Sequence, residues 1–166
     1  MLRAALTTGL LAAAIAGTAV AGPYADAVAA YVAAFARGDY ATAMRLLQPL
    51  ADQGNAGAQS NLGLMYANGQ GVSQDHSEAM KWFRKAAGQG VAEAQFNLGL
   101  MYGNGLGLPQ DYVQAHKWYN LAASRYPASE KEKRDTVVRN RDRVAAKMTP
   151  EQIAQAQKLA REWKPK

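Results

Sequence analysis

Few side chains in this sequence could carry out chemistry, and they do not form a recognised catalytic or metal-binding motif. His76 and His116 are the only histidines, and cysteine is absent. A zinc or hydrolase site needs such groups together with carboxylates at a defined spacing, as in HExxH, and neither histidine has that context. We therefore expect both histidines to be exposed helix residues, and we predict a protein that is not an enzyme and holds no metal or cofactor.

Three aspartates recur at a fixed step of 36 residues, which suggests calcium binding or acid–base catalysis as one interpretation. They are Asp39, Asp75 and Asp111. Each aspartate stands alone at the expected start of a helix, where a carboxylate accepts hydrogen bonds from unpaired backbone N–H groups. We interpret all three as helix N-caps.

Two glycine-rich segments, 68–75 and 104–111, could in principle hold a phosphate group. They lack the GxxxxGK[ST] pattern of nucleotide-binding loops, and each joins two expected helices rather than a strand and a helix. Glycine permits the positive φ angles that a tight turn between helices needs. We interpret these segments as interhelical turns.

The positive charge is concentrated in the C-terminal part of the chain. Residues 22–123 contain 6 Lys and Arg against 7 Asp and Glu, whereas residues 124–166 contain 12 against 6. A solvated helix with i,i+4 ion pairs such as Asp135–Arg139 accounts for most of these charges. The alternative is an anionic partner bound by three closely spaced arginines. These are Arg139, Arg141 and Arg143.

The elements that carry these residues are set by an internal repeat. Residues 58–87 recur as residues 94–123, with 18 of 30 positions identical. Within each copy, apolar residues follow a helical period on both sides of the glycine-rich segment, which predicts a helix, a loop and a second helix. Such a repeat buries its apolar face only by stacking on the next one, so the chain is predicted to be an all-α solenoid.

Glycines and aromatic residues are placed to pack the two helices of each copy together. Gly63 and Gly99 lie on the apolar side of the first helix, where the missing side chain lets another helix approach closely. The second helix carries an aromatic pair, Trp82–Phe83 in one copy and Trp118–Tyr119 in the other. These rings could stack on sugars or bases, but their position on the apolar stripe favours core packing.

The chain is predicted to contain five segments. They are a signal peptide (1–21), a degenerate first repeat (22–54), two full repeats (55–90 and 91–124) and a C-terminal helical cap (125–166). Two helices are expected in the cap. A capping box at 129–132 would begin the first, and Thr149 followed by Pro150 would begin the second.

The repeat carries about a dozen residues at fixed spacing. In the first full copy these are Ala58, Leu62-Gly63-Leu64-Met65-Tyr66, Gly69-Gln70-Gly71-Val72, Asp75, Ala79, Trp82, Ala86-Ala87 and Gly90. This pattern resembles the Sel-one-like repeat family of the tetratricopeptide superfamily; in the second copy Leu108 replaces the loop valine, and no glycine closes that copy after Ala123. The resemblance implies a right-handed α-solenoid of antiparallel helix pairs that acts as a non-enzymatic scaffold for protein–protein contacts.

The resemblance also implies a binding face, because the family places the first helix of each repeat on the concave wall of the solenoid. Positions between the apolar stripes would then face the groove. They are Ser60, Leu64 and Asn68 in one repeat and Phe96, Leu100 and Asn104 in the next. Leu64 and Leu100 are apolar without belonging to the stripe, so we expect them to contact a bound peptide or protein segment.

The N-terminal residues have the pattern of a secretory signal peptide. Arg3 precedes an apolar run of roughly a dozen residues, and Ala19-Val20-Ala21 fits a cleavage site. A transmembrane helix needs about 20 apolar residues, so we expect cleavage near Ala21 and a periplasmic or secreted mature chain with no transmembrane span. Export argues against nucleic acid as a partner. A protein or peptide is expected, and peptidoglycan or another anionic envelope polymer bound by the basic tail is the alternative.

Overall fold

The structure, a computed structural model, describes residues 23–166, and every regular element in that range is a helix. The predicted signal peptide lies outside the described residues. The chain divides into two compact units, residues 1–86 and 87–166, with the boundary inside α5 (His76–Gly88). The all-α prediction is therefore confirmed for the part of the chain that the structure describes.

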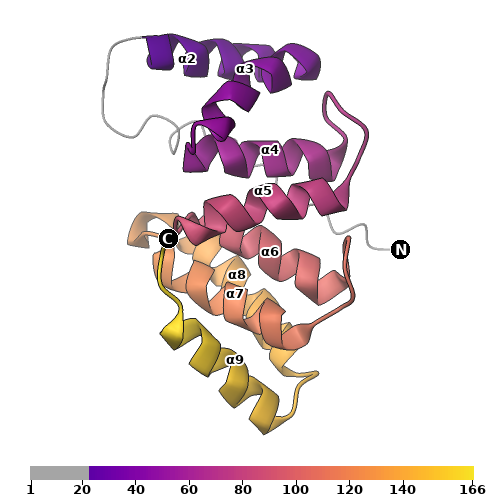
Figure 1. Cartoon of the computed structure of the whole chain (residues 1–166). Helices are drawn as coiled ribbons and strands as arrows, with labels where there is room; N and C mark the ends of the chain where they lie inside the picture. Colours follow the sequence, from indigo (N-terminus) through magenta and orange to yellow (C-terminus); the bar gives the residue numbers. More distant parts are fainter. Residues whose placement is uncertain (1–22) are drawn as a thin grey trace. The chain divides into compact units, whose positions relative to one another are not determined.

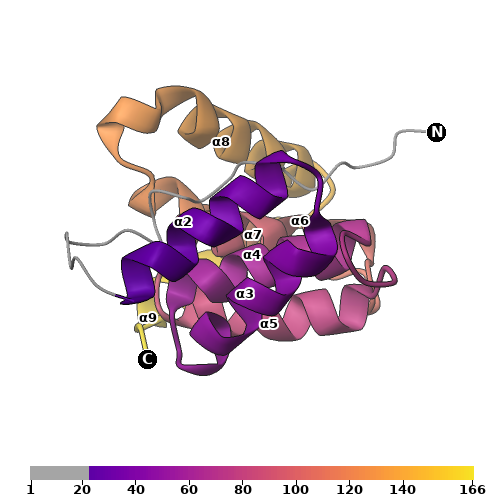
Figure 2. The same cartoon turned by 90° about the horizontal axis from the view of Figure 1, so that it is seen from above.

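The first unit is built from consecutive helices that pack in chain order. It contains α2 (Pro23–Ala36), α3 (Tyr40–Asp52), α4 (Ala56–Asn68) and most of α5. Helix α3 packs against both α2 and α4, as Figure 1 and Figure 2 show from two directions. The core of this unit includes Tyr31, Leu47, Leu62, Met65 and Trp82.

The second unit is centred on one helix. It contains α6 (Ala92–Asn104), α7 (Tyr112–Arg125), the 3-10 turn η1 (Ala128–Glu130), α8 (Lys131–Ala145) and α9 (Pro150–Glu162). Helix α7 packs against α6, α8 and α9, so the last two helices of the chain depend on the same support. The three helices that surround α7 can be followed in Figure 1.

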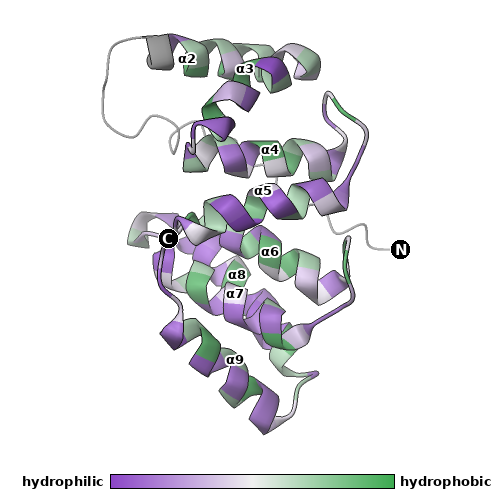
Figure 3. Cartoon of the chain, viewed as in Figure 1, coloured by the Kyte–Doolittle hydropathy of each residue, from purple (hydrophilic) through white to green (hydrophobic). Residues whose placement is uncertain are grey.

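The helices form because apolar residues recur at helical spacing. Figure 3 shows hydrophobic and hydrophilic residues alternating around the helices. In α5, Ala79, Met80 and Phe83 are buried, whereas Lys81 and Arg84 between and beside them are exposed. Burial of one such stripe supplies most of the stability of short helices like these.

The recurring aspartates cap helices, as predicted. Asp39 Oδ1 accepts a hydrogen bond from Thr42 N at 3.1 Å, and Asp111 Oδ1 accepts one from Gln114 N at 2.9 Å. Asp75 Oδ1 accepts from the N–H groups of Ser77 and Glu78 at 2.8 and 3.0 Å.

The glycine-rich segments are turns of the same design in both full repeats. Helices α4 and α6 end at Gly69 and Gly105, which have φ angles of 68° and 67°. A glutamine side chain then closes each turn. Gln74 Nε2 donates to Ala67 O, and Gln110 Nε2 donates to Gly103 O, both at 2.6 Å. The loops are thus explained by backbone geometry.

The contact glycines allow an aromatic ring to lie directly against a helix backbone. A Cβ atom added at Gly63 would lie 2.6 Å from the Phe83 ring, and one added at Gly99 would lie 2.5 Å from the Tyr119 ring. These separations are far shorter than a normal carbon–carbon contact of about 3.5–4 Å. The predicted close approach of the two helices in each repeat is therefore confirmed.

A buried glutamine links each full repeat to the helix before it, which the sequence analysis did not anticipate. Gln59 Nε2 in α4 donates to Ala51 O at 3.1 Å, and Gln95 Nε2 in α6 donates to Ala87 O at 3.2 Å. Both glutamines are at most 5% exposed. The feature of the sequence that could have predicted this link is the recurrence of the two glutamines at a step of 36 residues.

The start of the C-terminal helical segment differs from the prediction. Ser129 lies in the turn η1, and α8 begins at Lys131 without a side-chain cap, so the expected capping box at 129–132 is wrong. The expected pair of Asp135 with Arg139 is also wrong, because Asp135 pairs instead with Lys131 at 2.5 Å. The predicted helix start at Thr149 and Pro150 is confirmed. A capping box also forms there: Thr149 N donates to Gln152 Oε1, and Gln152 N donates to Thr149 Oγ1.

The glycine contact yields a stability prediction within one helix. Gly99→Ala should lower the free energy of unfolding by about 1–3 kcal/mol, because the new methyl group overlaps the Tyr119 ring. Gly103 is the matched control in α6. Its added Cβ would lie 3.6 Å or more from its neighbours, so Gly103→Ala should be neutral or stabilise by up to about 1 kcal/mol through helix propensity. Urea denaturation of both variants checks this, and equal stabilities would contradict it.

Candidate functional site

The candidate residues in the second unit lie along α6 and differ in exposure. Phe96 is 4% and Leu100 is 8% exposed. The Phe96 ring lies 5.9 Å from the Tyr119 ring, centroid to centroid, so it belongs to the packing of α6 on α7. Asn104 at the end of the helix is exposed, and its Nδ2 donates to Leu100 O at 2.8 Å.

The candidate residues in the first unit follow the same pattern along α4. Ser60 is fully buried, Leu64 is 6% exposed, and Asn68 is partly exposed. Our expectation that Leu64 and Leu100 stand apart from the packed interior is therefore wrong. In each unit, the asparagine at the helix end is the candidate residue with most exposure. Whether the six positions contact a partner stays a prediction.

The same two helices hold buried polar groups that lack hydrogen bonds. The Ser60 hydroxyl and the Asn61 amide nitrogen in α4 have no partner among residues 23–166, and neither amide atom of Asn97 in α6 has one. Buried polar atoms in folded proteins are nearly always paired, so each exception calls for an explanation. Asn61 and Asn97 recur at the 36-residue step, which is the signal that could have identified them from sequence.

Arg141 lies on the opposite side of α8 from Arg139 and Arg143, because positions two residues apart lie on opposite sides of a helix and positions four apart lie on the same side. Arg141 faces α7, where its guanidinium lies 3.5 Å from Asn120 Oδ1 and 2.8 Å from Asp142 Oδ1. Arg139 is exposed and donates to Thr136 Oγ1 at 2.8 Å. Arg143 lies instead beside the α6–α7 turn.

His116 is buried, contrary to the expectation of an exposed residue. It is 4% exposed, and its Nδ1 lies 3.2 Å from Asn120 Nδ2. Burial lowers the pKa of His116 below its usual 6.5, and the nearby Arg141 guanidinium lowers it further, against an opposing effect of Asp142. The helical periodicity of α7 did not predict the burial of His116, because this residue lies on the side of α7 that α8 covers.

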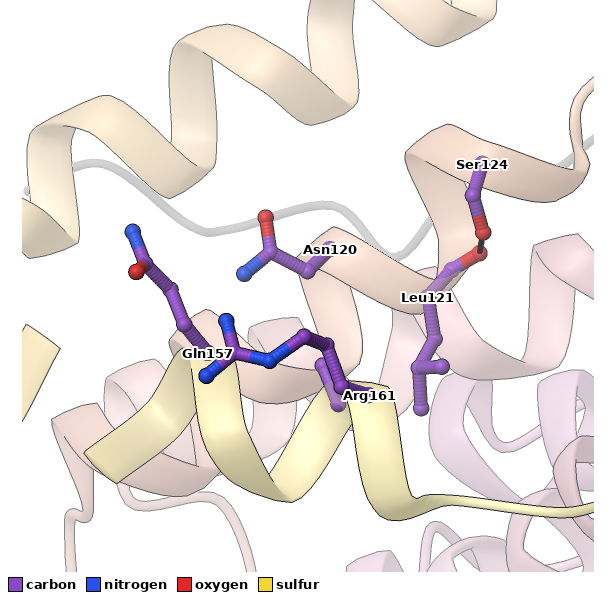
Figure 4. A pocket seen from close by; sticks show the side chains of 6 residues that line it. Asn120, Leu121, Ser124, Gln157 and Arg161 are labelled. Atoms are coloured by element: carbon purple, nitrogen blue, oxygen red, sulfur yellow. Dashed lines mark hydrogen bonds between the residues drawn. The ribbon is translucent and has the colours of Figure 1, made fainter. Parts of the chain in front are cut away.

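A shallow pocket lies between α7 and α9, with a volume of about 370 Å³. Figure 4 shows the Asn120 side chain of α7 facing Gln157 and Arg161 of α9, whereas the Ser124 hydroxyl is directed toward Leu121 O. Ser124 Oγ already donates to Leu121 O at 2.8 Å, and Asn120 is bonded to His116 and close to Arg141. The polar groups on the α7 side are therefore already used in intramolecular hydrogen bonds.

Within residues 23–166, no three His, Asp or Glu side chains gather as metal ligands. Over the same range, every helix is too short or too polar to cross a bilayer.

The geometry so far defines a class: an all-helical repeat protein of the α-solenoid type, whose conspicuous residues serve packing. The Sel1 repeat family model matches residues 34–55, 56–91 and 92–126, which together make up more than half of the chain. The chain therefore belongs to the Sel1 repeat family. Proteins with these repeats generally mediate protein–protein interactions, and they are typically non-enzymatic scaffolds.

Two solved structures are similar to this chain. One is c5321, described as a protective antigen present in uropathogenic Escherichia coli strains and displaying an SLR fold. It is 30% identical with a TM-score of 0.73, and the match covers 92% of this chain and 36% of that one. The other is a Sel1 repeat protein from Oxalobacter formigenes, 31% identical with a TM-score of 0.60, covering 84% and 55%. This chain thus spans about a third to a half of their lengths. No curated protein sequence matches it significantly.

The burial of His116 predicts a pH dependence of stability. Because the pKa of His116 is lowered in the folded state, the unfolded state binds the proton more tightly. The stabilisation should be complete above about pH 6.5, the usual histidine pKa, and should be lost as the pH falls from there toward the folded-state pKa. Thermal denaturation between pH 8 and pH 5 should show a smaller decline for His116→Gln than for the natural chain. An equal decline would contradict this assignment.

Proposed function

We propose that this protein is a non-enzymatic adaptor that binds a peptide or protein segment through the first helix of a full repeat, α4 in the first unit or α6 in the second, after export to the bacterial envelope. Membership of the Sel1 repeat family supports the binding role. The observation that carries the choice of helices is the unpaired side chain of Asn97 in α6, together with its repeat equivalent Asn61 in α4.

An unpaired amide is destabilising in the free protein and useful in a complex. Leaving a buried donor or acceptor without a partner costs about 1–3 kcal/mol. A peptide backbone offers both N–H and C=O groups, so one peptide group matches both atoms of the Asn97 amide. Asn97 is fully buried, so the side chains that cover it must move before this contact forms. Such a contact recognises the backbone of the partner and not its side chains, which suits an adaptor that binds extended segments.

The exposed end of α6 offers the place where a partner would first make contact. Asn104 is exposed and lies one helical turn beyond Leu100, which lies in turn close to Asn97 on the helix surface. The apolar side chains there are buried, so we expect affinity to come from a few hydrogen bonds and modest apolar contact. An interface below about 1,200 Å² in total is typical of transient complexes.

The partner test uses a photo-crosslinking residue at exposed positions in cells. Placed at Asn104, it should capture a defined partner. Placed at Lys81, on the second helix of the preceding repeat, it should not. Capture of nothing, or equal capture at both positions, would refute the proposed face.

The role of Asn97 gives a second, sharper outcome in the same assay. Asn97→Ala should reduce capture through Asn104 while leaving the free energy of unfolding unchanged or about 1 kcal/mol higher, because the amide is unpaired. Asn55→Ala is the matched control. Asn55 caps α4 through Ala58 N at 2.8 Å, so that variant should lose about 1 kcal/mol of stability and keep its partner. A stability loss in Asn97→Ala would indicate a structural role instead.

Export is proposed from the sequence pattern of the first residues. The positively charged start, the short apolar run and the Ala-x-Ala pattern together support a cleaved signal peptide. The exported chain should begin at Gly22, and the intact mass of the protein recovered from the envelope checks this. A mass that includes the first 21 residues would contradict cleavage.

A further inference from the structure

A small cavity in the second unit lies where α6, α7 and α8 meet, and the repeat pattern does not account for it. Its volume is about 170 Å³. Polar and cationic side chains dominate its lining. They are Asn104, Tyr112, Tyr119, Asn140, Arg143 and Lys147. The cavity joins a residue from the predicted groove, Asn104, with one from the predicted basic patch, Arg143.

The buried wall of the cavity contains a hydroxyl group without a hydrogen-bond partner. Tyr119 is 2% exposed, and its ring is fixed against Gly99. Its hydroxyl lies 3.7 Å from where a Cβ atom of Gly103, another lining residue, would be. Within the described chain, this hydroxyl makes no hydrogen bond. Burial raises the pKa of Tyr119 well above its usual range, so the hydroxyl keeps its proton and is available as a donor.

The open side of the cavity carries two cations. Arg143 is in the last turn of α8, Lys147 follows the end of that helix, and both line the cavity. Lys147 Nζ lies 3.4 Å from the Tyr112 hydroxyl and 5.3 Å from the centroid of that ring. Arg143 forms no ion pair with any residue from 23 to 166, and no carboxylate lines the cavity. The charge of this site is therefore uncompensated.

The two asparagines add acceptors to these donors. Asn104 Nδ2 donates to Leu100 O, and Asn140 Nδ2 donates to Thr136 O at 2.9 Å. Each side chain is therefore held by its own helix through the nitrogen, which leaves the amide oxygen for a ligand. A ligand that satisfies the whole site carries an anionic oxygen pair together with a neighbouring N–H or O–H group.

We propose that this cavity is a binding site for a small oxyanion, a carboxylate or a phosphate, held by the Tyr119 hydroxyl and the Arg143 and Lys147 cations. Arginine presents a planar fork of donors that matches both groups. A carboxylate next to an amide N–H and a hydrogen phosphate each supply the donor that the asparagine oxygens accept. The site shares Asn104 with the partner face proposed for α4 and α6, but Tyr119, Arg143 and Lys147 lie outside that face, so variants of these three residues test the oxyanion site separately.

The experiment is a titration of the full mature chain followed by the backbone amide signals of Gly103 and Asn104 in NMR spectra. One arm uses sodium phosphate, a second uses N-acetylglycinate, and sodium chloride at equal ionic strength is the reference. Saturable shifts are expected in at least one of the first two arms, and the arm that saturates at lower concentration identifies the natural oxyanion. Shifts that stay linear in both arms, as with chloride, would overturn the proposal.

Two variants assign the binding to the named groups. Arg143→Gln and Tyr119→Phe should each weaken the saturable binding by about tenfold or more, the loss expected for a hydrogen bond to a charged group. Arg134→Gln removes the same charge from α8 at an exposed position outside the cavity, and it should bind as the natural chain does. Equal affinity in Arg143→Gln and Arg134→Gln would overturn the assignment.

Folding of the variants can be checked separately. The Tyr119 hydroxyl is unpaired, so Tyr119→Phe should melt at the same temperature or higher. If Tyr119→Phe melted at a lower temperature, the Arg143→Gln variant would still test the proposal, because the Arg143 side chain is exposed.

Discussion

The packing of each full repeat depends on one contact, an aromatic ring lying against a glycine in the preceding helix. Phe83 on Gly63 and Tyr119 on Gly99 leave no room for a side chain at either glycine. The contact sets how closely the two helices approach. The turn glutamines and the aspartate caps recur with this contact in both full repeats.

Buried polar side chains differ in how completely they are hydrogen-bonded. Gln59 and Gln95 are bonded to the end of the previous helix and stabilise the joint between repeats, although Gln95 Oε1 has no partner among the described residues. Asn61 and Asn97 lie on the same helices, two positions further along, with amide atoms that no described residue satisfies. The Tyr119 hydroxyl lines the cavity between α6, α7 and α8, although the ring of this residue carries the central contact of the repeat. One side chain thus serves packing through its ring and remains available for a ligand through its oxygen.

The fold could be predicted from sequence because its signals are local. Periodicity, Asp caps and the glycine loops depend on neighbours within one helix turn, and the resemblance to a known repeat supplied the arrangement. The failures share a physical cause: they concern residues whose surroundings come from elsewhere in the chain. His116 is buried by contacts outside the repeat pattern, and Leu64 and Leu100 are far more buried than the stripe alone implies. Asp135 pairs with Lys131 and not with Arg139. Sequence spacing did not distinguish these two partners, because ion pairs on an exposed helix differ little in energy.

The glutamine joint bears on how this chain could have changed in length. The hydrogen bond from Gln59 to Ala51 and the one from Gln95 to Ala87 join repeats in the same way, so the 36-residue stretch begins and ends at interchangeable seams. A duplication or deletion of one whole stretch between those seams would create no new kind of contact, and it would leave α8 and α9 on the final α7-like helix. The number of repeats could therefore change during evolution without a new type of interface between repeats.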